Sequence, residues 1–161
     1  KALEIRNAPI ALVFTRQNLP VYERTQANSA ALTEKGAYIL SEAKNGKPDV
    51  ILIGSGSEVQ YAFNAQAVLE SKGIAARVVS MPSMELFAMQ TADYQESVLP
   101  KAVRKRVAIE AGSTMSWYRI VGSEGKVIGL DHYGASAPFE ILYKEFGFTT
   151  ENVVETTLSL F

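Results

Sequence analysis

The run Asp49-Val50-Ile51-Leu52-Ile53-Gly54-Ser55-Gly56-Ser57 organises the chain. Its first part is a continuous apolar and largely β-branched segment, which is typical of a strand buried on both faces. The glycine-rich turn leads into apolar residues at helical spacing from Val59 to Leu69, and Gly73 is suited to end a helix. The sequence therefore predicts a buried strand, a tight turn and an amphipathic helix in succession.

The same alternation of strand and helix extends to both sides of this unit. Further strands are predicted over residues 36–40, 74–80, 107–110 and 127–131. Further helices are predicted up to Leu99 with a cap from Asp93 and Glu96, around residues 117–121, from Pro138 to Gly147, and across Val154 to Phe161. Residues 22–32 are polar and lack periodicity, so we interpret them as a linker. Strands that alternate with helices indicate an α/β fold with a largely parallel sheet covered on both faces.

Composition excludes several classes of function. The chain has 161 residues, which is enough for one domain with a sizeable core. Its 16 basic and 17 acidic side chains give a formal charge of −1, which argues against nucleic acid or an anionic membrane as a partner. With no cysteine and one histidine, it can form neither disulfides nor thiolate or multi-histidine metal sites by itself. No apolar run approaches the roughly 20 residues of a membrane span, and a cytoplasmic location is the simplest expectation.

The first twenty residues do not fit the pattern of one complete domain. Apolar residues near the start resemble the end of a helix, and Ile10 to Phe14 form an apolar run that is expected to be a short strand. We therefore expect residues 1–20 to be the last piece of a preceding domain. Arg16 and Gln17 follow this strand directly, at the kind of position where α/β proteins bind phosphate. From residue type alone, a surface or interdomain ion pair is the commoner role for such an arginine.

Several short blocks occur in a fixed order along the whole chain. They are Ala11–Asn18 (ALVFTRQN), Pro20, Glu23-Arg24-Thr25, Gly36-Ala37-Tyr38, Gly54–Val59 (GSGSEV), Arg77–Pro82 (RVVSMP), Glu96–Pro100 (ESVLP), Glu110-Ala111-Gly112, Tyr133–Pro138 (YGASAP) and Lys144–Thr149 (KEFGFT). In this order they resemble the C-terminal third of bacterial-type transketolases. The resemblance rests on the succession of blocks, since no single block is specific.

This resemblance implies a three-layer α/β/α domain with a five-stranded, mostly parallel sheet, whose first strand, at residues 36–40, is antiparallel to the others. Residues 1–24 would be the tail of the preceding pyrimidine-binding domain with a linker, and residues 25–161 the C-terminal domain. The parent enzyme would transfer a two-carbon ketol unit between sugar phosphates. Thiamine diphosphate and a divalent ion, Mg²⁺ or Ca²⁺, would be bound by upstream domains at the interface of a homodimer.

The resemblance also assigns roles to residues of this chain. Arg16 matches the arginine that binds the substrate phosphate in transketolases, so it is the one substrate-binding residue expected here. Gln17 is interpreted as a residue that holds the loop. The family's catalytic, thiamine-binding and metal-binding segments have no counterpart in this sequence. By itself the chain is therefore expected to be an inactive accessory domain that binds no cofactor or metal.

Three further features are predicted to be structural. The Gly54 to Ser57 turn lacks the third glycine and the following acidic residue of a dinucleotide site, so Ser57 is expected to cap the next helix with Gln60. Glu110 is expected to accept backbone N–H groups at the start of the following helix. His132 follows Asp131, but neighbours on a strand point to opposite faces, so no catalytic dyad is predicted.

Two sets of aromatic residues could in principle stack on nucleic-acid bases. They are Trp117-Tyr118, next to Arg119, and the set Phe139, Tyr143 and Phe146. Neither set is interleaved with a basic run, and the spacing is helical, so packing in the core is predicted.

Two functions of other classes stay open for the chain. One is a regulatory module that binds a small molecule at the carboxyl ends of the strands, near Gly56, Met81, Gly112 and Gly134. The other is an interaction domain without a ligand. A saturable rise in melting temperature with sugar phosphates or nucleotides would support the first. A stable dimer without such a rise would support the second.

Overall fold

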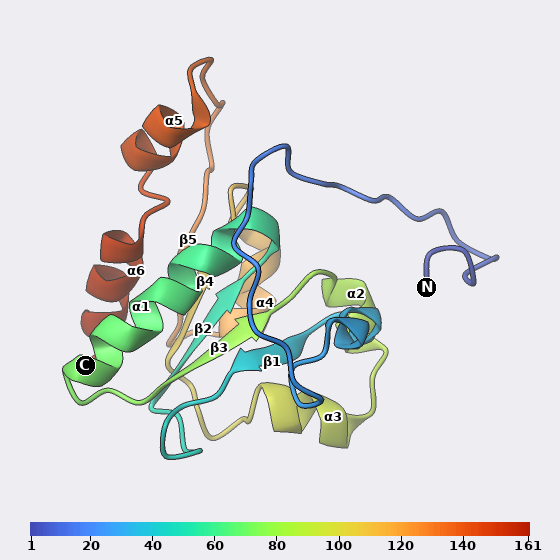
Figure 1. Cartoon of the computed structure of the whole chain (residues 1–161), viewed down its shortest axis with the longest axis horizontal. Helices are drawn as coiled ribbons and strands as arrows, with labels where there is room; N and C mark the ends of the chain where they lie inside the picture. The colour runs from blue at the N-terminus through green and yellow to red at the C-terminus, as the bar shows by residue number, and fades with distance from the viewer.

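A five-stranded mixed sheet forms the centre of the chain in a computed structural model that describes all of residues 1–161. The strands are β1 (Tyr38–Ser41), β2 (Val50–Gly54), β3 (Ala76–Ser80), β4 (Arg106–Ile109) and β5 (Lys126–Ile128). Their order in the sheet is β1-β3-β2-β4-β5 (Figure 1). The edge strand β1 pairs antiparallel with β3, and all other pairs are parallel. The predicted fold class is confirmed, including the antiparallel first strand.

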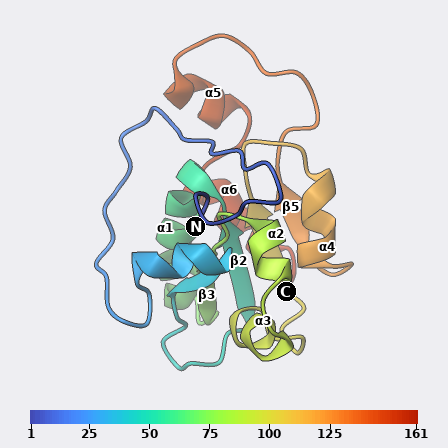
Figure 2. The ribbon, with the colours of Figure 1, turned by 90° about the vertical axis from the view of Figure 1, so that its right-hand side faces the viewer.

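Helices cover both faces of this sheet, so the domain has three layers (Figure 2). The α-helices are α1 (Val59–Ser71), α2 (Met84–Ala88), α3 (Ala92–Val98), α4 (Tyr118–Val121), α5 (Phe139–Glu145) and α6 (Thr150–Leu158). Short 3₁₀ turns are η1 (Ala30–Lys35), η2 (Gly56–Glu58) and η3 (Met115–Trp117). Helices α1 and α6 pack on one face, and α2, α3 and α4 on the other. Helix α5 lies apart from both layers, at the top of Figures 1 and 2.

Strand β2 supplies apolar side chains to two separate cores. Val50 and Leu52 belong to the cluster beneath α1 and α6, whereas Ile51 and Ile53 belong to the cluster beneath α3 and α4. All five residues of β2 are buried. Because side chains alternate along a strand, only an unbroken apolar run can serve both faces, which is why the sequence of β2 does not alternate.

The predicted packing of the aromatic residues holds for only part of the set. Trp117 is 1% exposed in the cluster beneath α4, and Tyr143 and Phe146 pack against the edge of the other cluster. Tyr118 and Phe139, in contrast, are 56% and 39% exposed. Helix α5 has no buried residue, because it lies beyond the end of the sheet and turns only one side toward the domain.

The polar segment before η1 is held by the side chain of Asn28. Its amide Nδ2 donates to the carbonyl oxygens of Glu23 and Leu40, and its Oδ1 accepts from the backbone N–H of Thr25 at 2.6 Å. This residue thereby ties the segment to strand β1. The predicted linker over residues 22–32 is thus an ordered connection that ends in η1, a turn that the sequence pattern does not indicate.

Two helical details differ from expectation. Helix α2 is not among the predicted elements, although Ser83 caps it by accepting a hydrogen bond from the N–H of Leu86. The cap of α3 is Thr91, whose hydroxyl accepts from the N–H of Tyr94, so Asp93 lies within the first turn instead of capping it.

Strand β5 ends at Ile128, earlier than predicted. Beyond it, the N–H of Leu130 donates to the carbonyl oxygen of Gly112.

The expected strand over Ile10 to Phe14 does not form. These residues take no part in the five-stranded sheet, and no backbone hydrogen bond joins them to any other segment. The expected helix end near Lys1 is a single turn. A strand requires a partner for its N–H and C=O groups, and residues 1–14 extend away from the domain, where none is available (Figure 1).

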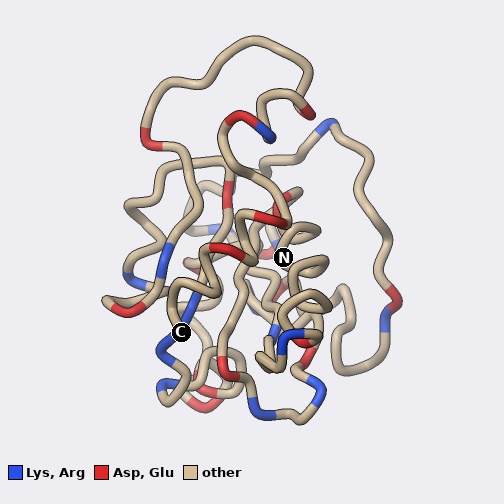
Figure 3. The backbone as a smooth tube through the Cα atoms, turned by 90° about the vertical axis from the view of Figure 1, so that its left-hand side faces the viewer, with Lys and Arg blue, Asp and Glu red and all other residues tan.

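Charged residues of both signs are interspersed along the whole chain (Figure 3), and no stripe of one sign forms. This distribution is consistent with the prediction that nucleic acid is not a partner. None of the helices has both the length and the apolar character that crossing a membrane requires.

Gly36 allows the segment before β1 to contact helix α2. Its φ is +84°, and a Cβ atom built there would lie 2.2 Å from the backbone nitrogen of Phe87 and 2.4 Å from the carbonyl oxygen of Ser83. We predict that Gly36→Ala lowers the free energy of unfolding by at least about 3 kcal/mol, since both the left-handed backbone and the contact become strained. Urea unfolding followed by the fluorescence of Trp117 measures this loss.

Gly46→Ala is the matched control for this substitution. Gly46 also has a positive φ, +66°, but no atom lies within 4 Å of the place that a Cβ would take there. This control is expected to cost only about 1 kcal/mol. Equal losses at the two positions would contradict the role assigned to the contact with α2.

Candidate functional site

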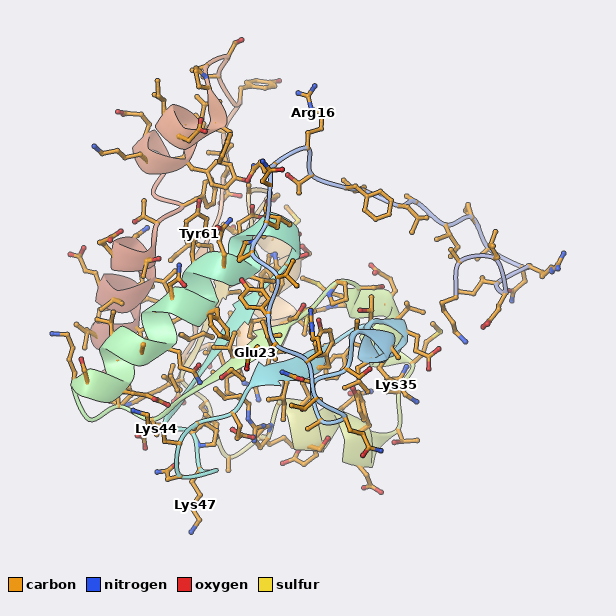
Figure 4. All side chains as sticks on the ribbon, in the orientation of Figure 1. Arg16, Glu23, Lys35, Lys44, Lys47 and Tyr61 are labelled. Carbon is orange, nitrogen blue, oxygen red and sulfur yellow. The ribbon has the colours of Figure 1, made fainter.

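Arg16 lies on an exposed loop at the same end of the molecule as α5. Its guanidinium makes no hydrogen bond and no ion pair, and Figure 4 shows it pointing away from the domain. The bend of the loop is supported locally, because the N–H of Gln17 donates to the hydroxyl of Thr15 at 3.2 Å. The free guanidinium can therefore bind an anion without first leaving another partner.

Gln17 turns toward the domain, opposite to Arg16. The residue is half-buried. Its Oε1 atom is buried without a hydrogen-bond partner. That Gln17 holds the loop stays a prediction.

A buried carboxylate follows the glycine-rich turn after β2. Glu58 is 5% exposed, and its Oε1 accepts hydrogen bonds from the hydroxyls of Tyr143 at 2.6 Å and Ser57 at 2.5 Å. Its Oε2 accepts from the N–H of Ala111 at 3.2 Å. Glu58 therefore joins the turn after β2, the loop after β4 and helix α5.

The environment of Tyr143 shifts the ionisation of its phenol. Burial raises the pKa of this group, and the hydrogen bond to the Glu58 carboxylate raises it further. The neighbouring hydroxyl of Ser57, 3.2 Å from the phenol oxygen, lowers the pKa of Tyr143 and is a smaller effect. The phenol thus stays protonated and donates its proton to Glu58.

The glycine-rich turn after β2 does not have the predicted cap. Ser55 precedes the first turn, and the hydroxyl of Ser57 is directed to Glu58 instead of a backbone N–H. The expected pairing with Gln60 exists in another form, because the Gln60 amide donates to the carbonyl oxygen of Ser57 at 2.9 Å. Sequence spacing identifies the partners, but it cannot show that a buried carboxylate competes for the serine hydroxyl.

Glu110 also differs from its predicted role. Its Oε2 accepts from the indole N–H of Trp117 at 2.7 Å, and no backbone N–H donates to its carboxylate. The ring of Trp117 is buried, and its one polar atom needs a partner, which Glu110 provides. The carboxylate is structural, as predicted, but its partner is a side chain.

The sequence predicts no catalytic dyad of His132 and Asp131, and the two side chains have other partners in the structure. The carboxylate of Asp131 accepts from the N–H and the hydroxyl of Thr114 at 2.9 and 2.7 Å. Both hydrogen bonds lower the pKa of Asp131, and the bond from the backbone N–H has the larger effect. The ring of His132 packs edge-on against Phe146 instead, with 5.3 Å between centroids.

Two hollows open near the carboxyl ends of the strands. One, of about 180 Å³, lies between the segment Leu19 to Arg24 and the start of α1. The other, of about 760 Å³, is a shallow surface depression lined by residues that include Thr114, Tyr118 and His132. No group of three or more acidic or histidine side chains is placed to hold a metal ion. Neither hollow contains Arg16 in its lining.

The family model of the transketolase-like C-terminal domain matches residues 36–149. The chain belongs to the transketolase family. It is 48% identical to a transketolase of Bacillus subtilis and 52% identical to transketolase 1 of Aliivibrio fischeri, in each case over 99% of this chain and 24% of the relative. The chain thus spans about a quarter of the length of these curated relatives.

Solved structures agree with this assignment. A transketolase of Pichia stipitis in complex with sedoheptulose-7-phosphate superimposes with a TM-score of 0.78 at 36% identity, over 90% of this chain and 20% of that one. The resemblance inferred from the sequence blocks is therefore confirmed for this transketolase C-terminal domain.

The raised pKa of Tyr143 predicts a pH dependence of stability. A phenol that is kept protonated by the fold contributes stability below its unfolded pKa, near 10.0, and this contribution is lost as the pH rises through the higher folded pKa. Wild-type stability should therefore fall more steeply above about pH 10 than that of Tyr143→Phe. Urea unfolding of both proteins at a series of pH values measures the difference.

Tyr133→Phe is the control, because the Tyr133 ring is 99% exposed and its surroundings change little on folding. Its pH dependence should match that of the wild type. If Tyr143→Phe lost stability with the same slope as both, the folded domain would not hold the Tyr143 phenol in its protonated form.

Proposed function

We propose that this chain is the C-terminal accessory domain of an enzyme that transfers a two-carbon ketol unit between sugar phosphates. The observation that carries the proposal is the match to transketolases over 99% of the chain at about 50% identity. The related Pichia stipitis protein is described in complex with sedoheptulose-7-phosphate. Sugar phosphates are accordingly the substrate class proposed for the parent enzyme.

Within this enzyme, Arg16 would bind the substrate phosphate. Its side chain is exposed and lacks a partner, and its planar, positively charged group can donate two parallel hydrogen bonds to phosphate oxygens. The motif around it, ALVFTRQN, matches the transketolase motif that contains the phosphate-binding arginine. Residues 1–24 would then complete the preceding domain, and residues 25–161 would form the accessory domain.

The remaining parts of the enzyme would come from elsewhere. Thiamine diphosphate would supply the group that carries the ketol unit, and a divalent ion, Mg²⁺ or Ca²⁺, would hold its diphosphate. By resemblance to the family, both are assigned to the upstream domains. A homodimer in the cytoplasm, acting in the pentose phosphate pathway, completes the proposal.

The role of Arg16 predicts a substrate-dependent loss in the intact enzyme. A charge-assisted contact to phosphate is worth roughly 1.5–3 kcal/mol, so Arg16→Ala should raise KM for phosphorylated acceptors about ten- to a hundred-fold. The contact is remote from the reacting carbonyl, so kcat should change little. Unphosphorylated acceptors should be almost unaffected. Steady-state kinetics with a matched pair of acceptors is the measurement.

Two further variants sharpen this comparison. Arg16→Lys should recover only part of the loss, since an ammonium keeps the charge but not the paired donors. Arg119→Ala removes another exposed arginine, on α4, and should leave both KM values unchanged. If Arg16→Ala weakened both acceptors equally, Arg16 would be a structural residue and not a phosphate ligand.

The assignment of the cofactor to upstream domains predicts that the isolated chain does not bind it. Isothermal titration of residues 1–161 with thiamine diphosphate and Mg²⁺ should give no saturable heat. The intact enzyme, titrated in the same way, is the positive control. Micromolar saturable binding to the isolated chain would place a cofactor site in this domain and refute the assignment.

A further inference from the structure

We propose that the hollow between the segment 19–24 and the start of α1 is a binding site for a small oxyanion, either free phosphate or the anionic group of a small organic molecule. Arg24 is the charged ligand of this site. Bound there, the anion fastens the segment 19–24 to the sheet. The proposal does not depend on the role of Arg16, which is not among the residues that line the hollow.

The hollow lies at the edge of the sheet where α/β proteins commonly bind ligands. Gly56, which follows β2, and Ser80, which ends β3, place it beside the carboxyl ends of these strands. The segment 19–24, marked by Glu23 in Figure 4, forms the opposite wall and crosses the start of α1. The hollow measures about 180 Å³. Sites for drug-sized ligands measure roughly 300–1,000 Å³, so this one suits an ion or a very small molecule.

The lining of the hollow carries a single charge, and this charge is positive. Arg24 is its one basic residue, none of its residues is acidic, and none of the ion pairs of the chain includes Arg24. The Nη1 atom of Arg24 donates to the carbonyl oxygen of Asn28 at 3.0 Å and to the hydroxyl of Tyr38 at 3.2 Å. Its Nε and Nη2 atoms have no partner in the protein. The same pair of atoms in Arg77 holds both carboxylate oxygens of Glu42, so the free pair of Arg24 suits an oxyanion.

Two hydroxyl groups in the lining supply further donors. Tyr38 is 5% exposed, and its phenol oxygen accepts from Arg24, but its own proton has no acceptor in the protein. A buried donor without an acceptor costs free energy. The hydroxyl of Ser80 also lacks a partner in the protein. An oxyanion would accept hydrogen bonds from both groups, whereas a cation would leave both protons unpaired.

The ionisable groups around the hollow leave the charge of Arg24 in place. Burial raises the pKa of Tyr22, and Arg24 lowers it by a smaller amount, so this phenol in the lining is neutral near pH 7. Glu58 follows the lining residue Ser57, but its carboxylate is not part of the lining. It accepts hydrogen bonds from Ser57, Tyr143 and the N–H of Ala111. No phenolate or carboxylate in the lining therefore competes with an anion for the guanidinium.

The donors come from both walls of the hollow, so a bound anion links the walls. Arg24 belongs to the segment 19–24, whereas Tyr38 and Ser80 belong to the sheet. The segment forms no backbone–backbone hydrogen bond, and the aromatic contact of Tyr22 with Phe63, with 4.6 Å between ring centroids, is one of the contacts that hold it. An anion held from both sides would reduce the conformational freedom of the segment.

A hollow that holds only water makes a different prediction. Water also accepts hydrogen bonds from Tyr38 and Ser80, and Arg24 would then serve only to hold Asn28 and Tyr38. In that case Arg24→Ala lowers stability but leaves anion affinity unchanged. The dependence of anion affinity on Arg24 separates the two cases.

The experiment is isothermal titration of the intact enzyme with its cofactor bound, in a background of Arg16→Ala that weakens the proposed substrate site. The probes are inorganic phosphate and glycerol 3-phosphate, and glycerol is the uncharged control. We expect saturable binding of both phosphate probes and none of glycerol. Arg24→Ala should weaken this binding about ten- to a hundred-fold, and Arg24→Lys should recover only part of the loss. Tighter binding of glycerol 3-phosphate would assign the site to an organic ester, and equal affinities would assign it to the phosphate group alone.

Two variants test the site while Arg24 stays in place. Tyr38→Phe and Ser80→Ala each remove one donor and should weaken binding about three- to ten-fold. Ser80→Ala breaks no hydrogen bond of the folded chain, so it tests the site even if Arg24→Ala proves unstable. Arg119→Ala is the matched control, because it removes an exposed arginine that lines neither hollow. Its affinity for both probes should equal that of the background.

Three results would overturn the inference. They are the absence of saturable phosphate binding, equal affinities in Arg24→Ala and Arg119→Ala, and binding of glycerol as tight as that of glycerol 3-phosphate. None of these results bears on Arg16, whose role is tested by the selectivity of Arg16→Ala for phosphorylated acceptors in an enzyme with Arg24 intact. The proposed function and the oxyanion site can therefore fail independently.

Discussion

The whole domain depends on the burial of β2 from both sides. One face of β2 contributes Val50 and Leu52 to the first apolar cluster, and the other face contributes Ile51 and Ile53 to the second. All five residues of this strand are buried. The two helical layers can therefore form only if this strand is central. The tight turn at its end is part of the same constraint, because a side chain on Gly54 would lie 2.7 Å from the Cα of Val59. Helix α1 thus begins directly against the end of the strand.

The elements that can be predicted well from sequence are those whose side chains alone specify them. The unbroken apolar run of β2 and the periodic residues of α1 need no distant partner to be recognised. The missed elements are short. Helix α2 has five residues, too few to show a helical period of apolar residues. Its apolar side can be recognised only in the structure, where Phe87 is buried in the second core. Ser83 and Glu85, a cap followed by an acidic first turn, are the available signal for it.

The site is harder to predict because it is built from side chains that are distant in sequence. Glu58 and Tyr143 are separated by 85 positions, and no spacing rule connects them. Glu110 and Trp117 are only seven positions apart, but local rules give no reason to expect the polar atom of an indole in a core position as the partner of Glu110. Local rules assign Ser57 to a cap because they take no account of a buried acceptor. The motif around Arg16, in contrast, can be read from the sequence because its residues are contiguous.

The edges of the sheet have a consequence for self-association. Strand β5 has three residues, and the pairing of β1 with β3 is interrupted by a register shift between Ile39 and Ser41. Short and irregular edges are poor templates for the addition of a strand from another molecule. The extended residues Leu12, Val13 and Phe14 are 65%, 92% and 81% exposed, and their backbone groups are unpaired. This segment could therefore pair with a strand of another molecule when the chain is isolated. A charged residue placed within the segment would hinder such pairing and improve the solubility of the domain without changing its core.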